Sequence, residues 1–319
     1  MEDLSFIRKN LTRVFRILWN ILIVSDASRQ YPYRALEIVW TNLPHRVLSL
    51  RPVRAFGKVI HGRACVIQKR TPEAEYTRFL RNPPQLEVLR DLVLKKPNGS
   101  SLKMAVLGCS TGAELYSALW MIRSARPELN VVAIGLDISD SAIKKAREGE
   151  YSHGSTELEG LSEEAIKSLF VRNENSLKVQ KRLKEGVSWR VSDARNPRLQ
   201  AILGFQDIVF ANNFLCHMPD SEAADCLRNV SKLVAPGGYL FVWGVDLDVR
   251  TEAVRDLGLI PVTYKLEEVY NADKRALEVW PLKYWGLEPL DKSRSDWQLR
   301  YATVFQVPPH APASADVKK

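Results

Sequence analysis

From about residue 72 onward, short apolar runs alternate with segments whose apolar residues recur every three or four positions. The first pattern predicts strands and the second predicts amphipathic helices. Their alternation predicts an α/β fold with a mostly parallel, doubly wound sheet. A last strand is expected at 300–307, paired antiparallel at or near the sheet edge. The other expected strands are 103–108, 131–136, 176–183, 187–192, 207–212 and 239–245, and the expected helices are 85–94, 113–125, 139–148, 162–170, 220–234 and 250–257.

The first 70 residues differ in charge from the rest of the chain. They hold 13 Lys and Arg against 4 Asp and Glu, which accounts for the whole net charge of +9. Apolar residues from Leu4 to Leu22 recur at helical spacing beside basic ones, which predicts a basic amphipathic helix. Such a helix packs on its own domain, or it docks an acidic protein partner or a membrane surface. The sequence contains no recognisable nucleic-acid-binding motif, so nucleic acid is not expected as a partner.

These differences divide the chain into three expected parts. Residues 1–74 form a small, basic, mainly helical N-terminal region, 75–307 form the α/β domain, and 308–319 form a disordered tail. Four scattered cysteines without a C-x-x-C pair argue against disulfides and against a metal site, and they fit a reducing compartment. With no signal peptide or membrane span legible, we expect a cytoplasmic protein, with peripheral membrane association through the basic helix as an alternative.

The candidate ligand site lies where the predicted strands end. Gly108 and Gly112 bound a turn between a strand and a helix, where backbone can approach a ligand at a helix N-terminus. Asp137 ends the next strand and can accept hydrogen bonds from a ribose diol, or it can cap the following helix. Asp193 follows a later strand and can face an adenine amino group or simply form a turn. Glu114, in the first turn of the helix, suits the helix dipole and can also face an ammonium group.

Two classes of nucleotide-dependent protein compete for this pattern. A nicotinamide dinucleotide enzyme would carry G-x-G-x-x-G, whereas the turn here reads G-C-S-T-G from Gly108 to Gly112. The spacing is wrong for a pyrophosphate. The order of the segments is typical of S-adenosylmethionine (SAM) methyltransferases.

Four ordered blocks between about residues 75 and 245 resemble the chemotaxis-receptor glutamate methyltransferases, the CheR family. The family's T-x-F-F-R reads T-R-F-L-R at 77–81, and its A-S-T-G-E-E-P-Y-S reads C-S-T-G-A-E-L-Y-S at 109–117. Its D-I-D and K-A-R-x-G-x-Y segments resemble 137–139 and 145–151. Its R-N-V-L-I-Y-F resembles N-N-F-L-C-H-M at 212–218. The resemblance implies a Rossmann-like class I methyltransferase fold.

The resemblance also implies how the cofactor SAM is held. Arg81 would pair with its methionine carboxylate, Glu114 would face its amino group and Asp137 would hold its ribose. Asp193 would stand at the adenine, and Asn213 would line the methionine end near the methyl group. The cofactor-binding residues so implied are Arg81, Gly108, Ser110, Gly112, Glu114, Asp137, Ile138, Asp193 and Asn213.

The departures from the family fall on the acceptor side. The family's Arg before the motif Asn is Asn212 here, its Tyr is His217, and its G-H-S-E is replaced by a segment containing Val245 and Asp246. We expect His217, Asn212 and Asn213 to form the catalytic cluster of an O-methyltransferase. A carboxylate of a protein glutamate or of a small acid is the first acceptor, since it needs no general base. For an alcohol, phenol or amine, His217 would supply one. The alternative is a catalytically weak SAM-binding sensor or scaffold of the same fold.

Overall fold

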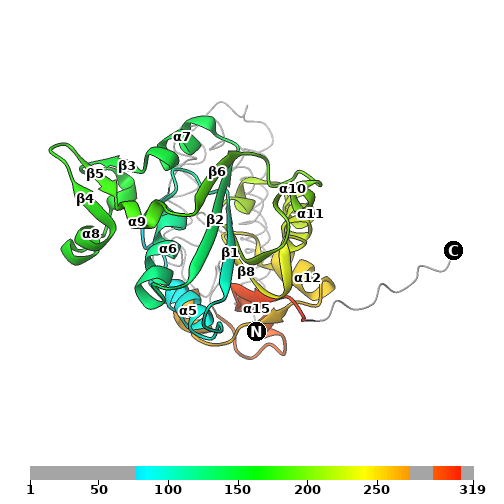
Figure 1. Ribbon diagram of the computed structural model, residues 1–319. Helices are drawn as coiled ribbons and strands as arrows, with labels where there is room; N and C mark the ends of the chain where they lie inside the picture. Colours follow the sequence, from blue (N-terminus) through cyan, green and yellow to red (C-terminus); the bar gives the residue numbers. More distant parts are fainter. Residues whose placement is uncertain (1–76, 273–289, 310–319) are drawn as a thin grey trace, which may run out of the picture. The chain divides into compact units, whose positions relative to one another are not determined.

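The computed structural model describes residues 77–272 and 290–309 (Figure 1). The predicted N-terminal helix lies outside these residues, as does most of the predicted tail. No helix in the described ranges is long and apolar enough to cross a bilayer. The main sheet formed by these residues has the strand order β6-β2-β1-β7-β8-β10-β9. Its strands are β1 (Ser101–Leu107), β2 (Asn130–Asp137), β6 (Val187–Val191), β7 (Gln206–Asn212), β8 (Val234–Trp243), β9 (Ile260–Pro261) and β10 (Val304–Gln306).

The pairing of these strands confirms the predicted α/β class. Strands β6, β2, β1, β7 and β8 are parallel neighbours, while β10 pairs antiparallel with both β8 and β9. The chain moves outward from β1 through β2 to β6 and then returns to place β7 on the other side of β1. The strand order therefore reverses between β1 and β7, the point where open α/β sheets bind ligands.

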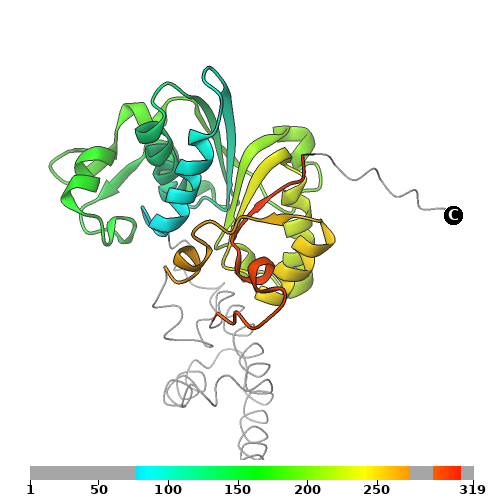
Figure 2. The ribbon, with the colours of Figure 1, turned by 90° about the horizontal axis from the view of Figure 1, so that it is seen from below.

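Helices cover both faces of this sheet (Figure 2). Helices α5 and α6 pack together on one face, and α11 and α12 pack together on the other. Met104 to Leu107 of β1 are fully buried between the layers, as are most residues of β7 and β8. Besides α8 and α9, whose bounds are given below, the α-helices in the described residues are α5 (Pro83–Leu94), α6 (Ala113–Ala125), α7 (Asp140–Glu148), α10 (Leu199–Leu203), α11 (Asp220–Ser231), α12 (Leu247–Asp256), α13 (Leu266–Tyr270) and α15 (Trp297–Tyr301).

A second, three-stranded antiparallel sheet is inserted between α7 and β6. It is built from β3 (Glu150–Ser152), β4 (Phe170–Arg172) and β5 (Ser176–Val179) with helix α8 (Glu163–Leu169), and it lies at the left of Figure 1. Rings of Phe79, Tyr151 and Phe170 meet edge to face beneath it. The hydroxyl of Tyr151 donates to the carbonyl oxygen of Thr111 over 2.6 Å, which ties this sheet to the turn after β1.

Several predicted boundaries are wrong for identifiable reasons. The strand expected at 176–183 ends at Val179, and the chain then turns into α9 (Lys181–Lys184). The helix expected at 220–234 ends at Ser231, because β8 already begins at Val234. The strand expected at 239–245 begins earlier, at Val234, and residues 235–238 form a bulge inside β8, with Gly237 at a φ of +79°. Helix α5 begins at Pro83 rather than 85, since proline fits a first helical turn.

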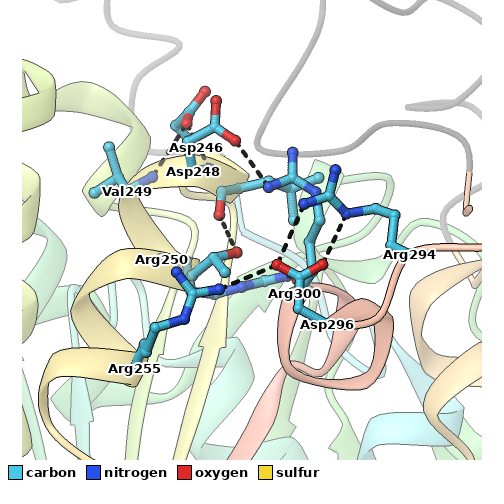
Figure 3. A network of polar contacts seen from close by, with 10 residues as sticks. Asp246, Asp248, Val249, Arg250, Arg255, Arg294, Asp296 and Arg300 are labelled. Carbon is cyan, nitrogen blue, oxygen red and sulfur yellow. Dashed lines mark hydrogen bonds and ion pairs between the residues drawn. The ribbon is translucent and has the colours of Figure 1, made fainter.

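The last predicted strand is also shorter than expected. Only Val304–Gln306 pairs with the sheet, while Arg300 and Tyr301 form the end of helix α15. Figure 3 shows why: Arg300, 4% exposed, binds Asp248 of α12 at 2.8 Å, and its carbonyl oxygen accepts from Arg250 at 2.9 Å. Arg255 binds Asp296 beside them at 3.0 Å. These contacts fix the segment as a helix against α12. Helix α12 itself starts at Leu247, earlier than predicted, because the Asp246 carboxylate caps it.

Candidate active site

The turn after β1 is closed at both ends by glycines in the left-handed region. Gly108 has a φ of +60° and Gly112 a φ of +90°. A Cβ on Gly108 would lie 2.7 Å from Cβ of Phe214, and one on Gly112 would lie 2.8 Å from the Trp189 ring. Ser110 between them also has a positive φ, of +46°. The close packing of Phe214 and Trp189 therefore requires glycine at both ends of the turn, which fixes the backbone path between β1 and α6.

Asp137, at the end of β2, joins this turn to the next loop. The Ser110 N–H donates to one carboxylate oxygen over 2.8 Å, and the Ser139 N–H donates to the other over 2.9 Å. The helix-capping alternative for this carboxylate is not realised, since Ser139 caps α7 with its own hydroxyl. Next to it, Ile138 exposes 73% of its surface. A fixed carboxylate beside an open apolar side chain suits a nucleoside, whose ribose is polar and whose base is flat.

Glu114 and Arg81 come together at the start of α6. Leu80, beside Arg81, donates its N–H to the Ser117 hydroxyl of α6 over 2.9 Å, which fastens the upstream motif to the helix. Burial raises the pKa of the half-buried Glu114 to about 7, against the opposing effects of a hydrogen bond from Asn212 and the charge of Arg81. The site thus combines the positive charge of Arg81 with the Glu114 carboxyl, whose pKa lies near neutral pH. An amino acid has a carboxylate and an ammonium group, which these two side chains can bind.

The polar cluster expected after β7 divides into two parts. Asn212 is only 4% exposed and turns toward Glu114, to which its Nδ2 donates over 2.7 Å. Asn213 adopts a φ of +60° and donates its N–H to the carbonyl oxygen of Trp243 over 2.8 Å. His217 ends the short 3₁₀ turn η3 (Leu215–His217) and is half-buried. Asn212 therefore lies with the cofactor-side carboxyl, while Asn213 and His217 occupy the loop that follows.

Asp193 is held by a residue that sequence reasoning missed. Arg195 donates from its guanidinium to both carboxylate oxygens, at 2.7 Å for the shortest contact, and also reaches Glu222 at 3.3 Å. These hydrogen bonds lower the pKa of Asp193. The two-residue spacing in D-A-R is a signal that could have suggested the pair. A second missed residue is Gln85 of α5, whose Oε1 accepts from Asn212 at 3.0 Å.

Comparison with known proteins identifies a family for this arrangement. The model of the family described as CheR methyltransferase, SAM binding domain, matches residues 75–252. Chemotaxis protein methyltransferase 2 of Vibrio cholerae is 27% identical over 175 residues, covering 52% of this chain and 60% of that protein. Chemotaxis protein methyltransferase 1 of Pseudomonas aeruginosa is 28% identical over 177 residues, covering 52% and 64%. A protein of Pseudomonas putida named as a probable biofilm formation methyltransferase is 27% identical over 171 residues, covering 52% and 40%. The chain therefore spans less than two thirds of these relatives' lengths.

Solved structures give a more distant likeness. Magnesium protoporphyrin IX methyltransferase from Synechocystis with bound SAM is 15% identical, with 57% of this chain and 71% of that chain covered at a TM-score of 0.34. The N-methyltransferase NodS from Bradyrhizobium japonicum with S-adenosylhomocysteine is also 15% identical, with 58% and 78% covered at a TM-score of 0.34. The fold assignment here rests on the strand order and pairing.

Proposed function

The chain belongs to the CheR methyltransferase family, and from that premise we propose that it transfers the methyl group of SAM to an oxygen acceptor. The observation that carries the proposal is the Asp137 carboxylate, which receives backbone N–H groups from the loops after both β1 and β2. It lies at the carboxyl ends of β1 and β2, beside the reversal of strand order between β1 and β7, and nucleosides bind at this edge of open sheets.

The residues present fit SAM. The turn from Gly108 to Gly112 has a fixed backbone path, because an added Cβ at either glycine would clash with Phe214 or Trp189. Asp137 offers acceptors for a ribose diol, and the exposed Ile138 beside it offers an apolar surface for the base. Arg81 and Glu114 supply opposite charges for the carboxylate and ammonium groups of a methionine moiety. Asp193, bound by Arg195, is proposed to stand on the adenine side.

When bound, SAM supplies a methyl group on a sulfonium centre that needs no further activation. The chain's residues then contribute mainly position and desolvation. The Asn213 backbone, held by β8, fixes the loop that we assign to the methionine end. His217 follows on the same loop, where an acceptor would approach. An ionised carboxylate acceptor has no proton to lose, so His217 would orient it, whereas for a hydroxyl or amine it would take the proton.

Two measurements on the full chain test this function. Titration calorimetry should show SAM binding to the wild type and a clear loss of affinity for Asp137→Ala, and unchanged affinity would reject the assigned pocket. Transfer of a radiolabelled methyl group from SAM to a panel of carboxylate, hydroxyl and amine acceptors should proceed with a carboxylate. Tight SAM binding without turnover on any acceptor would favour a SAM-binding sensor or scaffold instead.

A further inference from the structure

A line of buried side chains connects Glu114 to three other elements of the domain. Asn212 of β7 donates through Nδ2 to Glu114 Oε1 over 2.7 Å and to Gln85 Oε1 over 3.0 Å. Gln85 of α5 in turn donates through Nε2 to the hydroxyl of Thr303, just before β10, over 3.5 Å. Gln85, Asn212 and Thr303 are 5%, 4% and 3% exposed. Glu114 is the half-buried end of this line.

The direction of the Asn212 amide shows which group it serves. Its Nδ2 lies between two oxygens, one of Gln85 and one of Glu114, so both contacts require the donor end of the amide. In this orientation Oδ1 of Asn212 is buried and has no hydrogen-bond partner in the described part of the chain. A buried acceptor without a partner costs free energy. The unpaired Oδ1 is therefore the consequence of an amide orientation in which Nδ2 donates to the carboxyl of Glu114.

We propose that Asn212 and Gln85 are positioning residues that hold Glu114 ready for the ammonium group of SAM. This inference rests on the proposed function, and it moves Asn212 from the expected acceptor cluster to the recognition of the methyl donor. Asn212 orients the carboxylate by a direct hydrogen bond, and Gln85 holds the Asn212 amide in the donating orientation. Neither residue needs to contact the reacting atoms.

The charges around Glu114 give this role a measurable signature. Burial raises the pKa of Glu114 to about 7, while the Asn212 hydrogen bond and the charge of Arg81 lower it. Burial raises the pKa of the nearby Cys109 thiol, and the charges of Asp137 and Glu114 raise it further. Because an ammonium group prefers the ionised carboxylate, donor affinity should fall as the pH drops below about 7. Loss of the Asn212 hydrogen bond should move that fall to higher pH.

The experiment is a calorimetric titration of the full chain with S-adenosylhomocysteine between pH 6 and pH 9. The wild type should bind roughly tenfold more weakly at pH 6 than at pH 8, as expected for a carboxyl that ionises near pH 7. Asn212→Ala should bind roughly fivefold more weakly than wild type at pH 7, if its carboxyl titrates about one pH unit higher, and the two affinities measured at pH 9 should be nearly equal. Gln85→Ala should show the same change, but smaller.

Three controls separate positioning from a general loss of structure. Gln206→Ala removes a buried amide at the opposite end of β7 and should leave the pH profile unchanged. Glu114→Gln should abolish the pH dependence, and Asn212→Ala added to it should restore none. The ligand 5′-methylthioadenosine, which lacks the amino-acid moiety, should bind wild type and Asn212→Ala with the same affinity.

A loss of affinity in Asn212→Ala that is equal at every pH, or equal for both ligands, would overturn the assignment, as would no loss at all. In those cases the proposed function still stands, because the wild type binds. If neither ligand binds the wild type at any pH, the proposed function itself fails, and this assignment fails with it.

Discussion

The loops at the ends of β1 and β2 are built differently from the loop at the end of β7. In the first pair, backbone N–H groups of Ser110 and Ser139 converge on the Asp137 carboxylate, and two glycines with positive φ bound the turn after β1. After β7, the geometry comes from side chains: the Asn212 amide turns inward, and Asn213 packs so close to Gly244 that an added Cβ there would lie 2.9 Å from the Asn213 Oδ1. A site for the methyl donor that is held by backbone groups depends on the identity of few residues. A site for the methyl acceptor that is formed by side chains can change its specificity when those residues are substituted.

The largest expected effect comes from closing the backbone turn. Gly108→Ala places a Cβ about 2.7 Å from the Phe214 side chain at a φ of +60°. We expect destabilisation by about 2–4 kcal/mol from strain and overpacking together, measured by urea unfolding. SAM affinity should fall on the order of a hundredfold, because the turn must shift.

The matched control for this change is Gly99→Ala. Gly99 has a φ of +76° but nothing within 4 Å of an added Cβ, so only the conformational strain of about 1 kcal/mol remains. Equal destabilisation by the two variants would show that the contact with Phe214 does not fix the turn.

The next largest effect is expected from Asp137, whose carboxylate accepts hydrogen bonds from the loops after β1 and β2. Asp137→Asn keeps the size of the side chain but turns an N–H toward one of the two backbone donors. We expect SAM affinity to fall roughly 10- to 100-fold, the worth of charge-assisted hydrogen bonds. Asp140→Asn, on an exposed residue in the first turn of α7, is the control and should change affinity less than about twofold. A comparable loss in both variants would point to general electrostatics rather than to the Asp137 site.

A smaller effect is expected on the acceptor side. His217→Gln should leave SAM affinity unchanged and slow methyl transfer to a carboxylate by about tenfold, since no proton has to be removed from that acceptor. Rates at saturating SAM, measured with radiolabelled methyl groups, check this. A loss above roughly a thousandfold would indicate a general base, and therefore a hydroxyl or amine acceptor.

The smallest effect belongs to the pair at the proposed adenine side. Arg195→Ala removes the partner of Asp193, but the two side chains are 54% and 37% exposed, so water replaces much of the interaction. SAM affinity measured by calorimetry should change by less than about fivefold. A larger loss would mean that Arg195 contacts the nucleoside itself.

The sequence predicted the features that depend on short segments. The mostly parallel sheet, and the position of Gly108 and Asp137 at the ends of neighbouring strands, follow from apolar periodicity and from the rule that parallel strands end at one edge. It could not predict Gln85, because a glutamine on an amphipathic helix is indistinguishable from a surface residue until packing buries it. It also missed the three-residue strands β3 and β4, whose pairing with β5 is set by contacts distant in sequence.

The segment 300–307 also shows that contacts distant in sequence limit what local patterns can predict. Apolar alternation at 300–307 predicted a strand, and residues Val304–Gln306 do pair antiparallel with β8. The ion pair between the buried Arg300 and the exposed Asp248 nevertheless keeps the first two residues of that segment in helix α15, and no local sequence pattern predicts such a partner.

A crystal structure of the full chain with S-adenosylhomocysteine would bear most directly on the donor site. The ribose hydroxyls should lie within hydrogen-bond distance of the Asp137 carboxylate, with the ammonium group against Glu114. A ligand bound elsewhere on the chain, or ribose hydroxyls out of hydrogen-bond reach of the Asp137 carboxylate, would contradict the site.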